Sequence, residues 1–435
     1  MAKKKQDLSP EERLAAALVP EEEWPYTLPD GWNWVRIGAL NDYKSSSITP
    51  STNPDDTFEL YSVPSIVNDY PEITKGMDIG STKQLVEKDD VLLCKINPRI
   101  NRVWKVSAHT THKCLASSEW IVVRVRSFFA SDYLMWFFRC PYFRERMLSN
   151  VSGVGGSLMR AKPRYVQTYP VALPPLSEQH RLVARIESLF AKLDAAREQA
   201  QSVLDSHEPR KAALLHDAFA GKLTAKWRKE HGIAADSWYT DTLKELCAKI
   251  TDGTHHSPPN TNKGDYMYVT AKNIKETGIM LDNITYVSSA VHDEIYSRCD
   301  VKKGDVLYIK DGATTGIATV NTLDEPFSLL SSVAVLRPHE ERLLPGYLKH
   351  LLNSSEQKSK MLNNMSGNAI TRLTLSKIKA TSIKVCSLSE QHEIVSILDR
   401  LLGWEEEVRQ SAESVLAAID RMKQAILARA FRGEL

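Results

Sequence analysis

The chain has 435 residues, of which 42% are hydrophobic and 25% are charged, and its formal net charge is +2. These values are ordinary for globular proteins and exclude wholesale disorder, a collagen repeat and a disulfide-stapled miniprotein. At about 100 to 200 residues per domain, the length predicts roughly two to four domains. No stretch is apolar enough to span a bilayer, and the acidic opening differs from a signal peptide, so we expect a soluble, cytoplasmic protein.

The cysteines and histidines do not predict a metal site. The six cysteines are scattered without a Cys-x-x-Cys pair. His255-His256 and His109-x-x-His112 have no Cys or carboxylate companion at metal-site spacing. We therefore expect buried, hydrophobic cysteines, loop or surface histidines and no metal ligands.

The charges are distributed unevenly along the chain. Residues 27–94 contain 5 Lys or Arg against 11 Asp or Glu, whereas residues 95–175 contain 13 against 3. Residues 343–387 contain seven basic residues and one acidic residue. Two separated basic fields favour a polyanionic partner. A solvated face that happens to be positive is the alternative for either field alone.

The chain contains an internal duplication. Leu176-Ser-Glu-Gln-His180 recurs as Leu388-Ser-Glu-Gln-His392, at an offset of 212 residues. Over 176–223 and 388–435, 19 of 48 positions are identical without a gap. The preceding segments correspond weakly, for example 86–92 with 301–307. The pattern predicts two halves, each with a divergent unit of about 150 residues followed by a preserved segment of about 50.

Each divergent unit reads as a small mixed domain, so we expect the α+β class. Apolar runs predict strands at 60–63, 91–96, 120–125, 266–270, 306–309 and 332–336, and helical spacing predicts helices at 134–140 and 347–352. We place an N-terminal extension at 1–27, the mixed domains at 28–175 and 238–387, and the helical repeats at 176–230 and 388–435.

The preserved segments predict two long helices. Ser177 is a suitable N-cap, Gly221 and Gly433 suit helix ends, and Pro209 should kink or restart the first helix near His207. Apolar residues recur in steps of three and four, which predicts a heptad seam. The seam residues are Leu182, Ile186, Leu189, Leu193 and Val203 in the first helix and Ile394, Leu398, Leu401, Val408, Val415, Ile419 and Met422 in the second.

The charges of the two repeats favour their pairing with each other. Residues 176–229 contain 10 basic and 7 acidic groups, and residues 388–435 contain 6 and 9, so +3 faces −3. The expected arrangement is an antiparallel coiled coil. The alternative is that each helix packs only on its own neighbouring domain.

Loops of the mixed units carry candidate DNA contacts. The segment 95–102 alternates cations with amides, which can bond guanine, adenine or phosphate, and 310–315 stands at the equivalent place in the second unit. A solvated turn is the alternative for each residue. The candidates are Lys95, Asn97, Arg99, Asn101, Arg102, Lys105, Arg160, Lys162 and Arg164, followed by Lys272, Asn273, Lys310, Asp311, Thr314, Thr315, Asn368 and Arg372.

Catalytic signatures are missing from the sequence, so we expect no catalytic residues. There is no glycine-rich phosphate loop, and Ser257-Pro-Pro-Asn260 has the wrong ends for an amino-methyltransferase motif. A self-contained nuclease or methyltransferase would need such a constellation. The remaining alternative to a DNA reader is a helical scaffold or adaptor without sequence-specific DNA binding.

Together the segments 28–35, 173–180, 221–228, 387–392 and 430–435 resemble the specificity subunit of bacterial type I restriction-modification enzymes. The resemblance covers nearly the whole chain beyond the first 25 residues. Cys386-Ser387 departs from it, because the first copy has Pro174-Pro175 at that place.

The resemblance implies that each mixed unit is a target recognition domain that reads one half of a split site in double-stranded DNA. It implies that the helices dock two modification (methyltransferase) subunits, with motor-nuclease restriction subunits outside. The complex would use S-adenosylmethionine, ATP and Mg, none of them bound by this chain. A helical spacer of about 30 to 45 Å would set half-site centres about one DNA turn apart.

Overall fold

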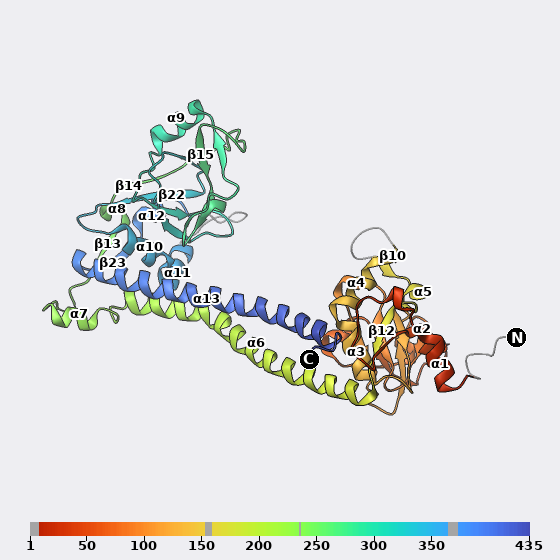
Figure 1. Ribbon diagram of the computed structural model, residues 1–435. Coiled ribbons are helices and arrows are strands. Elements are labelled where there is room, and N and C mark those ends of the chain that lie inside the picture. Colours follow the sequence, from red (N-terminus) through yellow and green to blue (C-terminus); the bar gives the residue numbers. More distant parts are fainter. Residues whose placement is uncertain (1–7, 153–158, 235, 364–372) are drawn as a thin grey trace. The chain divides into compact units, whose positions relative to one another are not determined.

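The computed structural model describes residues 8–152, 159–234, 236–363 and 373–435 (Figure 1). The chain divides into two compact units. Unit 1 comprises residues 1–200 and 414–435, and unit 2 comprises residues 201–413. Each unit therefore takes one part of each long helix, and each combines helices with antiparallel and mixed sheets, as the sequence predicts.

Unit 1 is built on two larger sheets of strand order β2-β5-β8-β3-β4 and β7-β6-β9, with β1 paired to β12 and β10 to β11. Its elements in chain order are α1 (Pro10–Ala17), η2 (Glu21–Glu23), β1 (Asn33–Arg36), α2 (Ile37–Leu40), β2 (Ser47–Ile48), η3 (Pro50–Thr52), β3 (Thr57–Tyr61), η4 (Pro64–Asn68), β4 (Glu72–Lys75), η5 (Gly76–Asp78), β5 (Lys83–Leu85), β6 (Val91–Cys94), η6 (Pro98–Ile100), β7 (Val103–Lys105), β8 (Lys113–Ala116), β9 (Trp120–Val123), α3 (Ser131–Arg139), α4 (Pro141–Ser149), β10 (Val151–Ser152), β11 (Arg160–Ala161), α5 (Pro163–Val166), β12 (Pro170–Leu173) and the first part of α6 (Leu176–Phe219).

Unit 2 repeats part of this plan with sheets β14-β22-β19-β20 and β18-β15-β21, with β13 paired to β23 and β16 to β17. Its elements are α7 (Ala225–Glu230), β13 (Tyr239–Thr242), α8 (Leu243–Leu246), β14 (Cys247–Asp252), β15 (Tyr266–Val269), η7 (Ala271–Asn273), β16 (Ile274–Lys275), β17 (Gly278–Ile279), β18 (Thr285–Val287), α9 (Ser289–Arg298), β19 (Val306–Ile309), β20 (Ala318–Val320), β21 (Ser328–Leu329), β22 (Val333–Pro338), α10 (Pro345–Asn353), α11 (Ser355–Asn363), α12 (Leu375–Ala380), β23 (Ser382–Val385) and the first part of α13 (Leu388–Ala430).

The two units share one layer and differ in the other. The sheet β7-β6-β9 with helices α3, α4 and α5 corresponds to the sheet around β19 and β22 with α10, α11 and α12. The remaining large sheet has five strands in unit 1 and three in unit 2. β6 and β19 are buried along their whole length, which explains why both predicted strands read as continuous apolar runs. The divergence between the halves is thus concentrated in the second sheet.

The repeated Ala-Phe-x-Gly motif anchors each helix end on its own unit. Phe431 packs edge-on against Tyr133 at 5.4 Å between ring centroids, and Phe219 packs edge-on against Tyr347 at 5.3 Å. Burial of such a ring stabilises a fold by about 1.5–3 kcal/mol. Gly433 then turns the chain with a φ of +75°, and Gly221 does so with +74°, as predicted for the helix ends. The duplication therefore preserves an aromatic contact and a glycine turn at the end of each long helix.

The first long helix, α6, differs from the sequence prediction at two points. The carbonyl of Pro175 already accepts the Gln179 N–H at 3.0 Å, so α6 begins at Leu176 and Ser177 is not its N-cap. α6 also continues through Pro209 without restarting. A proline removes one hydrogen bond without ending a helix whose side chains are packed on both sides of it. In α6, buried His207 and Leu215 flank the proline.

Within each unit, the two helices run antiparallel in contact. In unit 1, Lys423 pairs with Asp194 and Arg197 pairs with Asp420. In unit 2, Arg210 pairs with Glu405 through nitrogen–oxygen distances of 2.9–3.0 Å. The predicted antiparallel coiled coil is therefore confirmed for the fold, while the helices also pack on their own domains.

The seam itself is only partly as predicted. Leu182, Ile186, Ile394, Leu398 and Ile419 are buried, and Leu189, Leu193, Val203 and Leu401 are partly buried. The prediction is wrong for Val408, Val415 and Met422, which are 45%, 44% and 50% exposed. They lie four residues, or about 40° around the helix, before Ala412, Ile419 and Ile426, and Ala412 and Ile419 are buried.

Residues of the N-terminal segment pack into unit 1. Ala17 and Val19 are buried in its core, and the Val19 N–H donates to the carbonyl of Trp34 at 2.9 Å. All six cysteines are buried and unpaired. No helix in the described part of the chain is long and apolar enough to cross a membrane.

Candidate nucleic-acid interface

The β6–β7 connection in unit 1 is a tight, basic loop. Asn97 and Asn101 both adopt left-handed backbone conformations, with φ of +46° and +48°, and Pro98 between them is buried. Asparagine tolerates this conformation better than most residues, so the amides predicted to contact bases also shape the turn. Arg99 is exposed beside it. The loop thus carries the exposed Arg99 on a backbone whose conformation is fixed by its neighbours.

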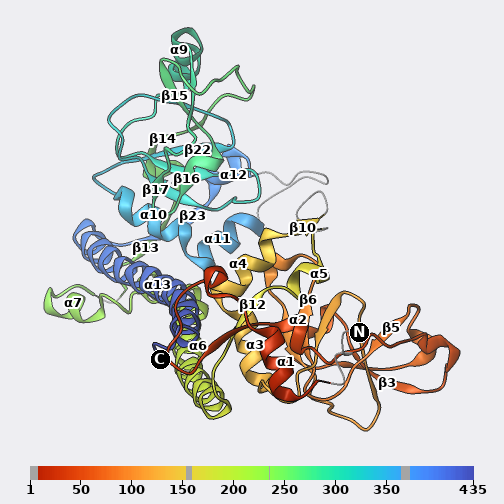
Figure 2. The ribbon, with the colours of Figure 1, turned by 45° about the vertical axis from the view of Figure 1, so that its right-hand side comes forward.

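A second basic segment lies against this loop although it is about 60 residues away in sequence. The carbonyl of Lys95 accepts the Ala161 N–H and the Asn97 N–H donates to the carbonyl of Met159, both at 2.8 Å. An isolated antiparallel bridge also pairs Ile96 with Arg160, so the segment that continues into Lys162 and Arg164 starts beside the loop. Figure 2 shows β6, β10 and α5 in the same region of unit 1. Arg164 stacks over the Tyr165 ring at 4.8 Å.

Two of the predicted contacts in unit 1, Arg160 and Lys105, are paired with carboxylates of the same unit, and Arg102 donates to the carbonyl of Ile96 at 3.4 Å. Arg160 donates to both carboxylate oxygens of Glu119 at 3.2 Å, and the Glu119 carboxylate raises the pKa of Arg160. Lys105 is paired with Asp132 on α3. In sequence, Asp132 is 27 residues from Lys105, and Glu119 is 41 residues from Arg160. Lys95, Arg99, Arg102, Lys162 and Arg164 form no ion pair in the described part of the chain.

The equivalent β19–β20 loop of unit 2 is less basic than its sequence indicates. Lys310 is only 6% exposed and lies 3.4 Å from Asp252 and 3.0 Å from Asp311. Thr315 is 8% exposed and donates to the carbonyl of Gly312 at 2.6 Å. Lys310 and Thr315 therefore hold the loop in this structure, and their contact with DNA stays a prediction. Thr314 is exposed at its tip.

Asn273 is also a structural residue. Its Oδ1 accepts hydrogen bonds from the Thr270 N–H and hydroxyl at 3.0 and 3.1 Å, and its Nδ2 donates to the carbonyl of Met280. The neighbouring Lys272 is exposed and forms no ion pair among the described residues. Two further predicted DNA contacts, Asn368 and Arg372, lie outside the described residues.

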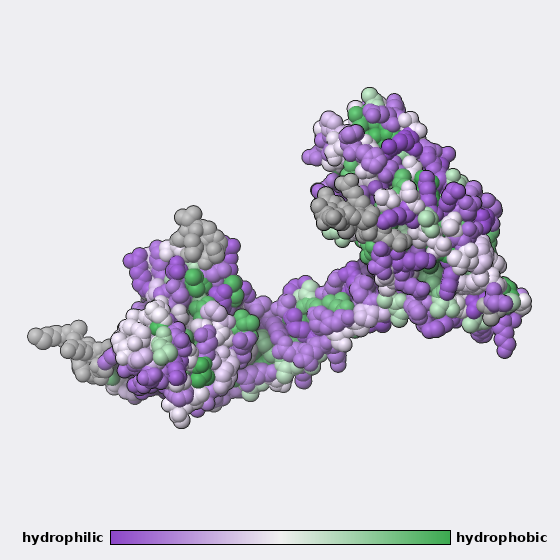
Figure 3. All heavy atoms as spheres, turned by 180° about the vertical axis from the view of Figure 1, so that it is seen from behind, coloured by the Kyte–Doolittle hydropathy of each residue, from purple (hydrophilic) through white to green (hydrophobic). Residues whose placement is uncertain are grey.

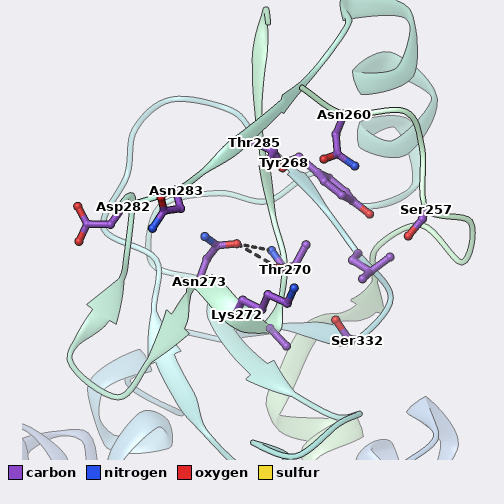
Figure 4. A pocket seen from close by; sticks show the side chains of 12 residues that line it. Ser257, Asn260, Tyr268, Thr270, Lys272, Asn273, Asp282, Asn283, Thr285 and Ser332 are labelled. Atoms are coloured by element: carbon purple, nitrogen blue, oxygen red, sulfur yellow. Dashed lines mark hydrogen bonds between the residues drawn. The ribbon is translucent and has the colours of Figure 1, made fainter. Parts of the chain in front are cut away.

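A cavity of about 600 Å³ opens beside Lys272 in unit 2 (Figure 4). Sequence reasoning missed most of its lining, which consists of Ser257, Asn260, Tyr268, Thr270, Ala271, Lys272, Asn273, Asp282, Asn283, Thr285, Leu330 and Ser332. These residues come from four separate segments, so no local pattern unites them. Its wall joins the β19–β20 loop, because the Lys310 N–H donates to the carbonyl of Ser332 at 2.9 Å.

Hydrogen-bonding, cationic and exposed apolar groups share the described surface. Among the described residues, no group of three His, Cys, Asp or Glu side chains could hold a metal ion. Figure 3 shows a surface dominated by hydrophilic residues with separate apolar patches. On α13, Trp404 is 57% exposed and continues the spacing of exposed Val408. Hydrogen-bonding and cationic groups with exposed apolar contacts are suited to macromolecular recognition.

Comparisons with known proteins find similarity to one family, the specificity subunits of type I restriction enzymes. A family model of the type I restriction modification DNA specificity domain matches residues 235–413. The chain is 23% identical over 312 residues to the EcoBI specificity subunit of Escherichia coli, a match that covers 68% of this chain and 64% of that protein. It is 22% identical to the EcoKI specificity subunit of Escherichia coli K12, which covers 81% of this chain and 76% of that protein.

Two solved structures share the fold. The crystal structure of the HsdS subunit from Thermoanaerobacter tengcongensis matches with a TM-score of 0.64 and 22% identity, covering 95% of this chain and 100% of that one. A chain from a structure on complex assembly and conformational transition of the type I R-M system matches with a TM-score of 0.76 and 23% identity, covering 94% and 100%.

Proposed function

The chain belongs to the family of type I restriction-modification specificity subunits, and we propose that each of its units reads one half of a bipartite DNA site. The observation that carries this proposal is the pair of homologous but unlike units. They share the sheet-and-helix layer next to the long helices and differ in their second sheets. Two different readers would recognise an asymmetric sequence.

In unit 1, the proposed reader is the surface formed by the loop 95–102 and the segment 159–166. Arg99 and Arg102 would contact base edges or phosphates, and Lys162 and Arg164 would hold the DNA backbone beside them. In unit 2, the exposed candidates are Thr314 and Lys272. We place the recognition domains at 28–175 and 238–387, with the extension 1–27 before them and the helical repeats at 176–230 and 388–435.

We further propose that the long helices dock two modification subunits and set the gap between the half-sites, with motor-nuclease subunits outside. Trp404 and Val408 in unit 2, and Val415 and Met422 in unit 1, are large apolar side chains that their own units leave exposed. Burying them against a partner would be favourable. S-adenosylmethionine, ATP and Mg would act in those other subunits, on cytoplasmic DNA.

The decisive experiment is a methylation map of DNA from cells that express this chain with its partner subunits. We expect two short specified blocks separated by several unspecified base pairs. One continuous site would contradict the two-reader proposal. A salt titration of DNA binding separates it from a plain scaffold, because phosphate contacts give a steep decrease of affinity with salt and a scaffold gives none.

A further inference from the structure

The cavity of unit 2 contains polar groups that the protein leaves unsatisfied. Within the described residues, the Ser332 hydroxyl is buried without a hydrogen-bond partner. The Tyr268 hydroxyl is buried with the Ser257 side chain close to it, at a geometry that makes no regular hydrogen bond. Tyr268 is only 3% exposed. Buried hydroxyls are nearly always paired, so two such hydroxyls in the lining of one cavity indicate a missing partner.

The cavity is polar but close to electrically neutral. Lys272 and Asp282 contribute one charge of each sign to its lining, and Asn260 and Asn283 add amides. Figure 4 shows Tyr268 and Ser257 on one side, Asn283 on the other, and Lys272 with Ser332 below. A phosphate group would be disfavoured beside Asp282. The lining therefore fits an uncharged group with several donors and acceptors.

The hollow shape restricts what part of a nucleic acid could enter. Base edges of an intact duplex lie at the floor of a groove and are reached by protruding side chains. A concave site of this kind accommodates a group that leaves the stack, such as an extruded base. The apolar side chains of Leu330 and Ala271 in the lining would contact the faces of such a base.

We propose that this cavity holds a nucleobase extruded from the half-site that unit 2 reads. The inference rests on the proposed function, because the base comes from DNA bound by this unit. The hydroxyls of Tyr268 and Ser332 bond the edge of the extruded base, and Lys272 lies where the adjoining backbone enters. The cavity thereby adds sequence preference at one position of the half-site.

The test uses the full complex with its modification subunits and duplexes that carry 2-aminopurine at each position of the mapped unit 2 half-site. Fluorescence of this analogue increases when it leaves the stack. The variants are Tyr268→Phe and Ser332→Ala, which remove only the hydroxyls. Tyr308→Phe is the matched control, because Tyr308 is also a buried tyrosine with an unpaired hydroxyl but does not line the cavity.

We expect one position whose fluorescence increases with the unaltered complex and not with either cavity variant, while Tyr308→Phe behaves as the unaltered complex does. Each cavity variant should bind cognate DNA about 2- to 12-fold more weakly and non-specific DNA unchanged. Specific binding without any such position, so that every fluorescence signal persists in both cavity variants, overturns the cavity proposal alone. Loss of all specific DNA binding by the unaltered complex overturns the proposed function.

Discussion

Gln179 and Gln391 occupy equivalent positions in the two units and make the same three hydrogen bonds. Gln179 Oε1 accepts the Ala130 N–H at 2.8 Å, and its Nε2 donates to the carbonyls of Phe128 and Pro174 at 2.9 Å. Gln391 Oε1 accepts the Leu344 N–H at 2.8 Å. Its Nε2 donates to the carbonyls of Arg342 and Cys386 at 2.9 Å. The repeated Leu-Ser-Glu-Gln-His motif therefore joins each long helix to its own domain.

The first prediction concerns this fully buried amide. Gln391→Ala leaves the Leu344 N–H and two carbonyls without their partner, so it should destabilise unit 2 by about 3 kcal/mol. Thermal or urea unfolding measures the loss. Gln199→Ala, at an exposed position of the other repeat, should change stability little. Equal effects of the two substitutions would contradict the joining role of Gln391.

The second prediction separates the two readers. Replacing Arg99 and Arg102 by alanine should change base preference only in the half-site assigned to unit 1, because these side chains are not used in ion pairs of the described chain. Competition binding with single-base variants of the site measures it. Arg126→Ala, on an exposed residue paired with Glu87, is the control for loss of a positive charge elsewhere in unit 1. A uniform loss over all sequences would instead mean phosphate contacts.

The third prediction distinguishes a structural lysine from an exposed threonine in the β19–β20 loop. Lys310→Met leaves Asp252 and Asp311 without their buried cation, which should cost about 3 kcal/mol of stability. Thr314→Val should leave stability unchanged and alter only the unit 2 half-site. Unfolding and binding assays on both variants test this contrast. A stable Lys310→Met variant would show that the pair is dispensable.

The fourth prediction is a pH dependence on α13. Hydrogen bonds from Arg409 lower the pKa of Glu406 from 4.5 to about 2. The folded pKa lies below the unfolded one, so this stabilisation is present above pH 4.5 and is lost as the pH falls towards 2. Between pH 4.5 and about 2, the melting temperature of the Glu406→Gln variant should fall less than that of the unaltered protein. Glu407→Gln, at a neighbouring exposed position, should keep the original slope.

The fifth prediction concerns the exposed apolar residues of α13. Trp404→Ser should weaken binding of a modification subunit about tenfold or more without lowering the melting temperature, because the ring is 57% exposed in this chain. Titration of the purified subunit measures the affinity. Val67→Ser, which removes an 86% exposed apolar side chain from unit 1, is the control. Unchanged affinity for Trp404→Ser would remove this surface from the proposed dock.

The sequence by itself determined the duplication, the two long helices and the buried central strands. These features depend on local periodicity or on direct comparison of the two halves. β6 and β19 were recognisable as apolar runs, and Gly221 and Gly433 as helix ends, because neighbouring residues alone produce these signals.

Only the tertiary structure decided which charged and polar residues are available to a ligand. Lys310 and Arg160 look like Lys95 and Arg99 in the sequence, yet their carboxylate partners, Asp252 and Glu119, come from other parts of the fold. The cavity beside Lys272 likewise combines segments that the chain separates by more than 70 residues, from Ser257 to Ser332. Charge pairing and burial depend on distances in space, which residue spacing along the chain does not contain.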